Sequence, residues 1–326
     1  MLTIGQERSA PTEIDVGQNV WALTFTANGE YLVTGDEKGV GVWRVKDGGK
    51  VARMETQRTV ISLAASKNGK WIAAGTTNEV VVWNAETYEA VIKYEEGSWI
   101  CGVDFSPDST RLVAGTDKCG AIVWDLATGK QVQTLVHQIR VIAAKYSPQG
   151  DRIATATLKG PIQVWDSDDG RLLVDIDVKA TPYYNTGLLW SNHHHLFVIS
   201  GEKIAEFNAS TSSKVSEWPV PNTNWDSSIT LPKHEQFIAF SAERIVTFWD
   251  TSMHNQLPLT LQHPEYIRSI TFSPDDCVLA IGGGGKITIQ GINVSTALCR
   301  AISSLNSFLV PASSPSASPT PYSPRT

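Results

Sequence analysis

One short pattern recurs seven times along this chain of 326 residues, at a nearly constant distance. Each copy ends a short run of alternating apolar and polar residues, and most copies close on an aromatic side chain. The closing positions are Trp43, Trp83, Trp124, Trp165, Phe207, Trp249 and Gln290. Successive positions lie 40 to 42 residues apart, which indicates internal repeats of one structural unit.

Every repeat carries the signals of several short strands. In the last repeat, IRSITF at 267–272 has the period of two that is typical of a half-buried strand, and SPDD supplies turn residues after it. A second run, the run that closes the pattern and a fourth run such as GKQVQTLV at 129–136 follow in each repeat. No helical period is sustained anywhere in the chain, which excludes helical repeats. Four strands in about 40 residues predict a blade of a β-propeller.

The chain resembles the WD-repeat (Trp-Asp repeat) family. The resemblance is carried by FSPD at 105–108, YSPQG at 146–150 and WD at 124–125, 165–166 and 249–250. It implies an all-β fold, a seven-bladed β-propeller of four-stranded antiparallel blades, because seven sheets packed radially bury faces that one sheet leaves exposed. The style of the repeats is similar to that of fungal WD-repeat proteins related to NACHT-WD propellers.

The repeats depart from the family pattern, which links His, Ser or Thr, Trp and a turn Asp by hydrogen bonds. The fourth repeat has His137, Thr155 and Trp165, but Lys159 stands where the Asp is expected. In the seventh repeat Gln290 replaces the Trp. We therefore expect no blade to hold the complete hydrogen-bonded set, while the apolar pattern preserves the fold.

Three segments are expected: a flexible N-terminus at 1–10, the propeller at 11–303, and a Ser/Pro-rich disordered tail at 304–326. Two segments compete to complete the last blade. TEIDV at 12–16 lies where a fourth strand would precede the first blade, and LCRAI at 298–302 follows Gln290. We favour the N-terminal strand, because joining the two ends of the chain closes the ring.

Composition narrows the functional classes. A formal net charge of −6 argues against a nucleic-acid partner, and no apolar run is long enough to cross a membrane. The four cysteines are widely spaced, which predicts reduced thiols rather than disulfides or a zinc site. Without a signal-peptide pattern, we expect a cytoplasmic protein, with the nucleus as the alternative.

No motif of catalysis is found, and we expect neither an enzyme, nor a cofactor, nor a metal. IGGGGK at 281–286 is followed by Ile287 rather than the Ser or Thr of a phosphate-binding loop, so its glycines are read as a tight turn. His193, His194 and His195 replace ordinary turn residues and are expected to face solvent, on the face opposite the candidate binding loops. Acidic clusters such as Asp166, Asp168 and Asp169 are read as turn formers.

The repeat register points to one surface. In the family, the loops that lead into the first strand of each blade open on the narrower face, where partners commonly dock. The large aromatic and basic residues that this register places there are Trp21, Trp99, Arg140, Tyr184, Trp225, Tyr266 and Arg268. Trp, Tyr and Arg dominate binding hot spots, because each combines a large contact area with a polar group. We expect these residues to bind a protein or peptide partner, with the arginines suited to acidic or phosphorylated groups.

The sequence thus predicts a non-catalytic interaction scaffold, either a monomer or a subunit of a larger complex. Two alternatives stay within binding functions: a substrate-recognition subunit of a ubiquitin ligase and a detached sensor module of a NACHT-type switch. The Trp-Asp-x-Arg sequence that is typical of cullin-4 receptors is absent, since the equivalents read WDLA, WDSD and WDTS. An alternative of another class is a propeller hydrolase.

Overall fold

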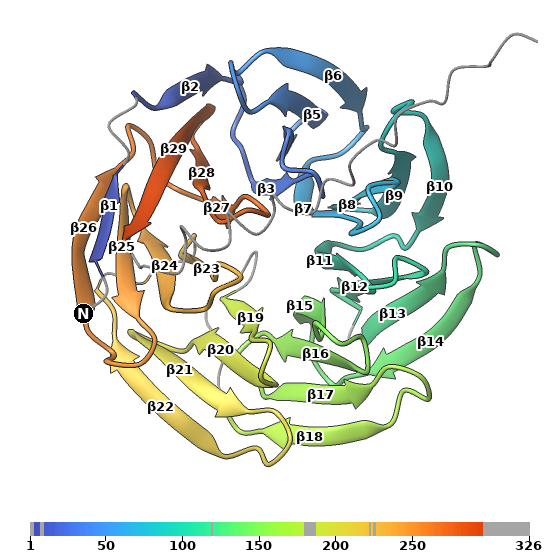
Figure 1. Cartoon of the computed structure of the whole chain (residues 1–326). Helices are drawn as coiled ribbons and strands as arrows, with labels where there is room; N and C mark the ends of the chain where they lie inside the picture. Colours follow the sequence, from blue (N-terminus) through green and yellow to red (C-terminus); the bar gives the residue numbers. More distant parts are fainter. Residues whose placement is uncertain are drawn as a thin grey trace, which may run out of the picture.

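Seven antiparallel sheets stand around a common axis like the blades of a propeller (Figure 1). A computed structural model describes residues 3–6, 10–118, 120–178, 187–221, 223 and 226–295. Six sheets have four strands each, and the seventh has five. The part of the chain that is described contains no helix. The predicted seven-bladed, all-β propeller is therefore confirmed, whereas the tail predicted at 304–326 lies outside the described residues.

The strands follow the chain from the innermost to the outermost position of each blade. Blade 1 is β3 (Ala22–Phe25), β4 (Tyr31–Asp36), β5 (Gly39–Arg44) and β6 (Lys50–Glu55). Blade 2 is β7 (Val60–Ala65), β8 (Trp71–Thr76), β9 (Glu79–Asn84) and β10 (Ala90–Glu95). Blade 3 is β11 (Ile100–Phe105), β12 (Arg111–Thr116), β13 (Gly120–Asp125) and β14 (Gln131–Val136). Blade 4 is β15 (Val141–Tyr146), β16 (Arg152–Thr157), β17 (Ile162–Asp166) and β18 (Leu172–Ile176).

The remaining blades keep the same order. Blade 5 is β19 (Leu188–Trp190), β20 (His195–Ile199), β21 (Lys203–Asn208) and β22 (Lys214–Pro219). Blade 6 is β23 (Ser228–Thr230), β24 (Phe237–Ala242), β25 (Ile245–Asp250) and β26 (Gln256–Gln262). Blade 7 is β27 (Ser269–Phe272), β28 (Val278–Gly283) and β29 (Lys286–Ser295), completed by β1 (Thr3–Gln6) and β2 (Thr12–Asp15).

Burial along the strands explains their sequences. A middle strand such as β12 is covered by a blade on each side, so LVAGT at 112–116 is buried without interruption. In an outermost strand such as β14 only Leu135 is buried and Gln133 is half-buried, while the other residues are exposed, because only one face of the strand meets a neighbour. The periodic signal in the sequence therefore differs between strands of the same blade.

The innermost strands share a position that carries only small, buried residues. These are Ala22, Ser62, Gly102, Ala143, Gly187, Ser228 and Ser269. A Cβ on Gly102 would lie 3.2 Å from the Cα of Ala143 in the next blade. Small residues are needed here because the backbones of neighbouring innermost strands approach one another closely.

The aromatic residues that close the repeats pack against the preceding blade. Trp165, for example, belongs to one buried cluster with Leu135 of blade 3. Its Nε1 donates a hydrogen bond of 2.8 Å to Oγ1 of Thr155, and the Nδ1 atom of His137 lies 2.8 Å from Oε1 of Gln163. Blade 4 thus joins His137, Thr155 and Trp165 by ring and hydrogen-bond contacts, with Gln163 as the partner of the histidine.

The N-terminal strand closes the ring. Strand β2 pairs with β29, with Thr12 opposite Ile289 and Asp15 opposite Lys286 (Figure 1). Ile14 is only 4% exposed and packs with Ile287 and Ile289 at the junction of blades 7 and 1. The predicted use of TEIDV as the closing strand is confirmed, and LCRAI lies outside the described residues.

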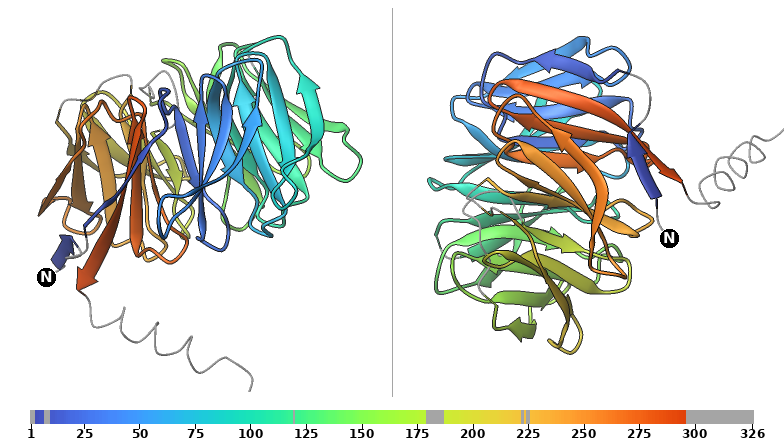
Figure 2. Two further views of the ribbon diagram at one scale, coloured as in Figure 1. Left: turned by 90° about the horizontal axis from the view of Figure 1, so that it is seen from above. Right: turned by 90° about the vertical axis from the view of Figure 1, so that its left-hand side faces the viewer.

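A second N-terminal strand was not predicted. Within the segment 1–10, which was expected to be flexible, Thr3–Gln6 form β1 and pair with the far end of β29 (Figure 2). Ile4 is 5% exposed and lies in one cluster with Leu261 and Ile292. The apolar side chain of Ile4 explains the ordered pairing, because it covers the junction of blades 6 and 7.

Candidate functional site

The loops between blades and the turns between second and third strands share one side of the propeller, which we call the aromatic face. Backbone hydrogen bonds tie the two kinds of connection together. The amide of Asp117 donates to the carbonyl of Trp99 at 3.0 Å, and the amide of Leu158 donates to the carbonyl of Arg140 at 3.1 Å. These bonds fix the loop backbone, so the direction of the loop side chains is set by the blades.

The structure places five of the seven candidate residues on the aromatic face: Trp21, Trp99, Arg140, Tyr266 and Arg268. Tyr184 and Trp225 lie outside the described residues. Tyr266 is 53% exposed and Trp99 is 40% exposed, so both rings present contact area to a partner. Trp21 and Arg268 are half-buried, and their side chains stack on each other.

Three blades meet in one stacked group. Arg268 belongs to the loop before blade 7, and Trp21 belongs to the loop before blade 1. The Cζ atom of Arg268 lies 3.9 Å from the centre of the Trp21 ring. An Nη1 atom of the same guanidinium donates to Oδ1 of Asp226, from the loop before blade 6, at 3.2 Å. A cation over an indole ring and an ion pair hold Arg268 in one orientation. We call Trp21, Asp226 and Arg268 the three-blade group.

A second ion pair lies farther around the face. Nε of Arg140 is 2.7 Å from Oδ1 of Asp117 in the turn of blade 3. The two predicted arginines, Arg268 and Arg140, therefore each have a carboxylate partner within the protein. An acidic ligand can therefore bind only those N–H groups of Arg268 and Arg140 that are not already bonded to Asp226 and Asp117. A third arginine, Arg244, stacks on Tyr266, with its Cζ atom 5.1 Å from the ring centre.

The acidic partners were missed in the sequence. Asp226 lies 42 residues before Arg268, which is one repeat length, and Asp117 belongs to the turn that contacts the Arg140 loop. The signal was present in the register, since equivalent loops of neighbouring blades lie side by side. Bulky and basic residues alone do not reveal these acidic partners.

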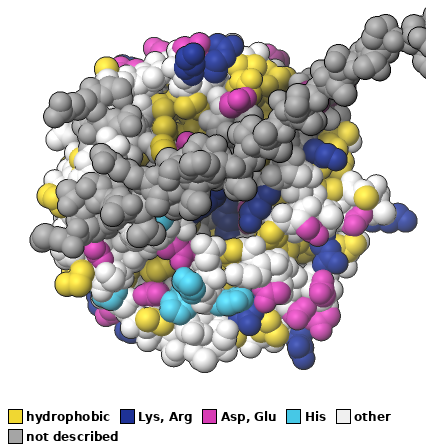
Figure 3. Space-filling model, viewed as in Figure 1, with side chains coloured by type: hydrophobic (Ala, Val, Ile, Leu, Met, Phe, Trp, Pro, Cys, Tyr) yellow, Lys and Arg dark blue, Asp and Glu magenta, His cyan; other side chains and the backbone are white. Residues whose placement is uncertain are grey.

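The three consecutive histidines lie on the opposite side of the propeller, which we call the histidine face. Figure 3 shows histidine side chains gathered on this face. His193 is exposed, whereas His194 and His195 are half-buried. His195 begins β20, and its Nδ1 atom lies 2.6 Å from Oε1 of Glu206. The expected solvent-facing turn is thus correct only for His193, because the His195 ring turns back onto the third strand of its own blade.

A depression of about 450 Å³ opens beside these residues, between blades 5 and 6. Its wall includes His193, His195 and Glu206 from blade 5 and His234 from blade 6. Burial lowers the pKa of His234, which favours its neutral form. Nevertheless, no group of three or more His, Cys, Asp or Glu side chains in the described part of the chain is placed to hold a metal ion.

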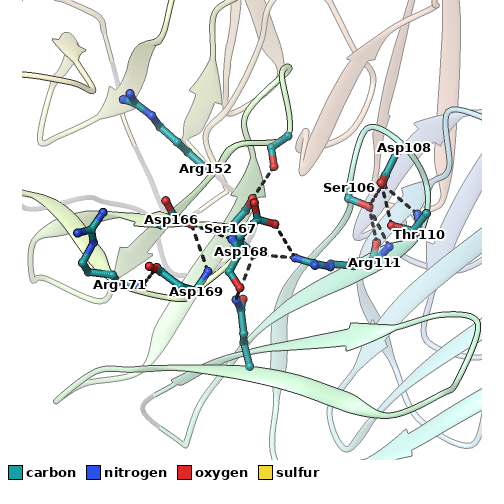
Figure 4. Close-up of polar contacts among 12 residues, drawn as sticks. Ser106, Asp108, Thr110, Arg111, Arg152, Asp166, Ser167, Asp168, Asp169 and Arg171 are labelled. Carbon is teal, nitrogen blue, oxygen red and sulfur yellow. Dashed lines mark hydrogen bonds and ion pairs between the residues drawn. The ribbon is translucent and has the colours of Figure 1, made fainter.

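Acidic residues on the histidine face serve as turn formers, as predicted. Oδ1 of Asp166 accepts hydrogen bonds from the amides of Asp168 and Asp169 at 2.9 and 3.2 Å (Figure 4). These bonds lower the pKa of Asp166 below its usual range. Arg111 of blade 3 donates to the carbonyl of Ser167 at 2.8 Å, which joins this turn to the neighbouring blade. These groups stabilise the turn rather than converge on a substrate.

The glycine-rich segment of blade 7 is a tight turn between β28 and β29. Gly284 and Gly285 have φ angles of +54° and +90°, which side-chain-bearing residues rarely adopt. The segment links two strands and no helix follows it, so it lacks the geometry of a phosphate-binding loop. The sequence-based reading of IGGGGK is confirmed.

Comparison with known proteins identifies the repeat family. No helix in the described ranges is long and apolar enough to span a membrane. No curated protein matches the chain. A family model described as the IFT122 first β-propeller matches residues 19–293, which include six complete blades and most of the seventh. The chain is a WD-repeat-type propeller and belongs to the family of the IFT122 first β-propeller.

Proposed function

We propose that this protein is a non-catalytic interaction scaffold whose aromatic face binds a protein or peptide partner. The observation that carries the proposal is the three-blade group, in which Trp21, Asp226 and Arg268 hold one another across three separate blades. Exposed Trp99, in the loop before blade 3, and exposed Tyr266, in the same loop as Arg268, add contact area to the same face. Side chains that are fixed before binding lose little conformational entropy when a partner docks.

The chemistry of the face favours a partner with mixed character. Trp99 and Tyr266 offer large, partly exposed rings for apolar contacts. Arg268 keeps further N–H donors beyond the one given to Asp226, and stacking on Trp21 orients them. A partner carboxylate or phosphate is expected to bind those donors, while the carboxylate of Asp226 limits the excess positive charge.

The test is capture of the partner from the source cells by the immobilised protein, followed by mass spectrometry. Trp99→Ala and Tyr266→Ala are each expected to lower partner recovery at least tenfold, because truncation of an aromatic hot spot costs about 2 kcal/mol or more. Met253→Ala is the matched control, since Met253 is 73% exposed on the histidine face. Equal recovery with Trp99→Ala, Tyr266→Ala and Met253→Ala would contradict the proposal.

A cytoplasmic site of action is part of the proposal and rests on the sequence alone. The relation to NACHT-linked propellers and the substrate-receptor alternative stay predictions. The hydrolase alternative is addressed by an esterase and phosphatase panel on the purified protein. Turnover that survives Trp99→Ala and is lost on mutation of His195 would favour catalysis on the histidine face.

A further inference from the structure

Neighbouring blades meet on the histidine face through one pair of equivalent positions. The first residue of a blade's second strand lies opposite the residue that comes two positions after the closing residue of the next blade. At four junctions both residues are apolar and belong to one cluster: Tyr31 with Ala85, Trp71 with Leu126, Phe237 with Ile292, and Val278 with Val45. Apolar contact therefore closes these four junctions.

Two further junctions are closed by an arginine. Nη1 of Arg111 in blade 3 donates to the carbonyl of Ser167 in blade 4 at 2.8 Å (Figure 4). Nη1 of Arg152 in blade 4 donates to the carbonyl of Ala209 in blade 5 at 3.2 Å and to Oγ of Ser210 at 2.9 Å. A guanidinium suits this position, because its several N–H donors can reach a carbonyl and a neighbouring side chain together.

The junction of blades 5 and 6 has neither kind of contact. His195 holds the position of the two arginines, and Thr251 holds the position of the carbonyl that they bind. The ring of His195 turns to Glu206 of its own blade, and within the described residues no side chain donates to the carbonyl of Thr251. The depression of about 450 Å³, which we call the blade 5–6 depression, lies at this junction and has all three residues in its wall.

A carboxylate stands in blade 5 where the other blades have an apolar side chain. Glu206 comes one residue before the closing Phe207. The equivalent residues are all buried: Val42, Val82, Val123, Val164, Phe248 and Ile289. The Glu206 side chain is 12% exposed, and its two oxygens have one partner each, Nδ1 of His195 and Oγ of Ser216. Because each carboxylate oxygen can accept two hydrogen bonds, both oxygens keep an acceptor position.

The charges of the blade 5–6 depression favour a cation as its ligand. Its wall contains two carboxylates, those of Glu206 and Glu235, against one ammonium group, that of Lys233. Burial lowers the pKa of His234, so this ring adds no positive charge near neutral pH. The carbonyl of Thr251 supplies a further acceptor. A planar group with several N–H donors matches spread acceptors better than a compact ammonium group does.

We propose that the blade 5–6 depression binds the guanidinium of an arginine side chain from a partner protein. The guanidinium takes the place that Arg111 and Arg152 fill at the two preceding junctions. Its N–H groups donate to the carbonyl of Thr251 and to the carboxylate of Glu206. This contact closes the junction from outside by the same chemistry that closes its neighbours from within.

The site is accessible and is independent of the aromatic face. Asn192, His193 and Ser252 belong to its wall and are exposed on the histidine face, so a side chain can enter from there. None of the residues that carry the proposed function takes part. Failure of this site leaves the capture experiment on Trp99 and Tyr266 unaffected, and the reverse also holds.

The first test uses the unaltered protein and small probes. In NMR titrations, N-acetyl-arginine amide is expected to shift the backbone amide signals of Asn192, His193 and Ser252. The lysine and citrulline analogues should bind at least about tenfold more weakly, because lysine lacks the planar fork and citrulline lacks the charge. Equal binding of the lysine analogue, or shifts centred elsewhere, would refute the proposal. Free arginine that binds more tightly than the blocked amide would also refute it, since the ligand would then be the amino acid rather than a side chain.

Two variants and one control test the contacts. His195→Arg places a guanidinium in the depression from within and is expected to abolish the shifts caused by N-acetyl-arginine amide. Glu206→Gln keeps the shape but loses the charge, so the probe should bind about 5- to 10-fold more weakly. Glu202→Gln is the matched control and should leave binding unchanged, because Glu202 is exposed between β20 and β21, outside the depression.

Two results would overturn the assignment. One is unchanged binding of the probe by His195→Arg, and the other is equal affinity of Glu206→Gln and Glu202→Gln. If a variant does not fold, the comparison of the arginine and lysine analogues on the unaltered protein decides the matter.

Discussion

Replacement of Ile14 by Ala tests how the ring is closed. Ile14 is 4% exposed, and its side chain packs with Val20, Ile287 and Ile289 between blades 7 and 1. Truncation of a buried Ile to Ala costs about 2–5 kcal/mol, because the lost burial is combined with a cavity. Strands on both sides hinder collapse of that cavity, so a loss of about 3 kcal/mol in the free energy of unfolding is expected.

The expected shift in melting temperature follows from the size of the propeller. Unfolding entropies of about 2.1 cal/mol/K per residue give about 0.6 kcal/mol/K for a propeller of this length. A loss of about 3 kcal/mol then lowers the Tm by about 5 °C, measured by calorimetry or by circular dichroism. Deletion of residues 1–17 should lower the Tm further, since it removes β1 and β2 and exposes the edge of β29.

Glu13→Ala is the control on the same strand. Glu13 points outward and is exposed, so its truncation should change the free energy of unfolding by no more than about 0.5 kcal/mol. If Ile14→Ala lowers the Tm no more than Glu13→Ala does, then β2 does not close the ring. Glu13 and Ile14 are neighbours whose side chains lie on opposite faces of β2. The two variants therefore compare loss of an exposed side chain with loss of a buried one on the same strand.

Two further predictions concern buried charge. Arg53→Ala should lower the free energy of unfolding in urea by about 3 kcal/mol, because it leaves the fully buried carboxylate of Asp36 without its partner. Adding Asp36→Asn should recover at least half of that loss, and no recovery would contradict the ion-pair explanation. Burial lowers the pKa of His137 and His263 below 6.5 in the folded protein. On acidification these histidines are therefore protonated in the unfolded chain before they are protonated in the folded protein. The free energy of unfolding is highest above pH 6.5 and falls as the pH drops through the lowered pKa values. The Tm should therefore be lower at about pH 5 than at about pH 7.5, with a smaller difference after His137→Gln and His263→Gln; a Tm that rises on acidification would refute this sign.

The fold was largely predictable because the same spacing recurs in every blade. The Trp and Phe positions set the third strand, and the turn residues after the first strand set its end. Even the closing strand followed from the position of TEIDV one strand before blade 1. Strand β1 was not predictable in this way, since the repeat contains no equivalent and only the burial of Ile4 explains its place.

The candidate surface was only partly predictable. The register placed Trp21, Trp99, Arg140, Tyr266 and Arg268 on one face, but it gave no information on which side chains are already paired. The pairings of Arg268 with Asp226 and Arg140 with Asp117 depend on distances between loops of different blades. The same limit explains the interpretation of His195, whose partner Glu206 lies on another strand.

The small residues of the innermost strands have a consequence for the number of blades. Six of the seven blades are wedges that are narrow at small residues such as Ala22, Ser62 or Gly102 and wide where an aromatic ring separates the blade from the one before; in blade 7 Gln290 takes the place of the ring. The difference in side-chain size between the two ends sets the wedge angle, and wedges of about 51° complete a circle when there are seven. Larger side chains at the narrow end would reduce that angle and favour a wider ring. The small residues of the innermost strands, among the least conspicuous in the sequence, thus help to set the number of blades in the ring.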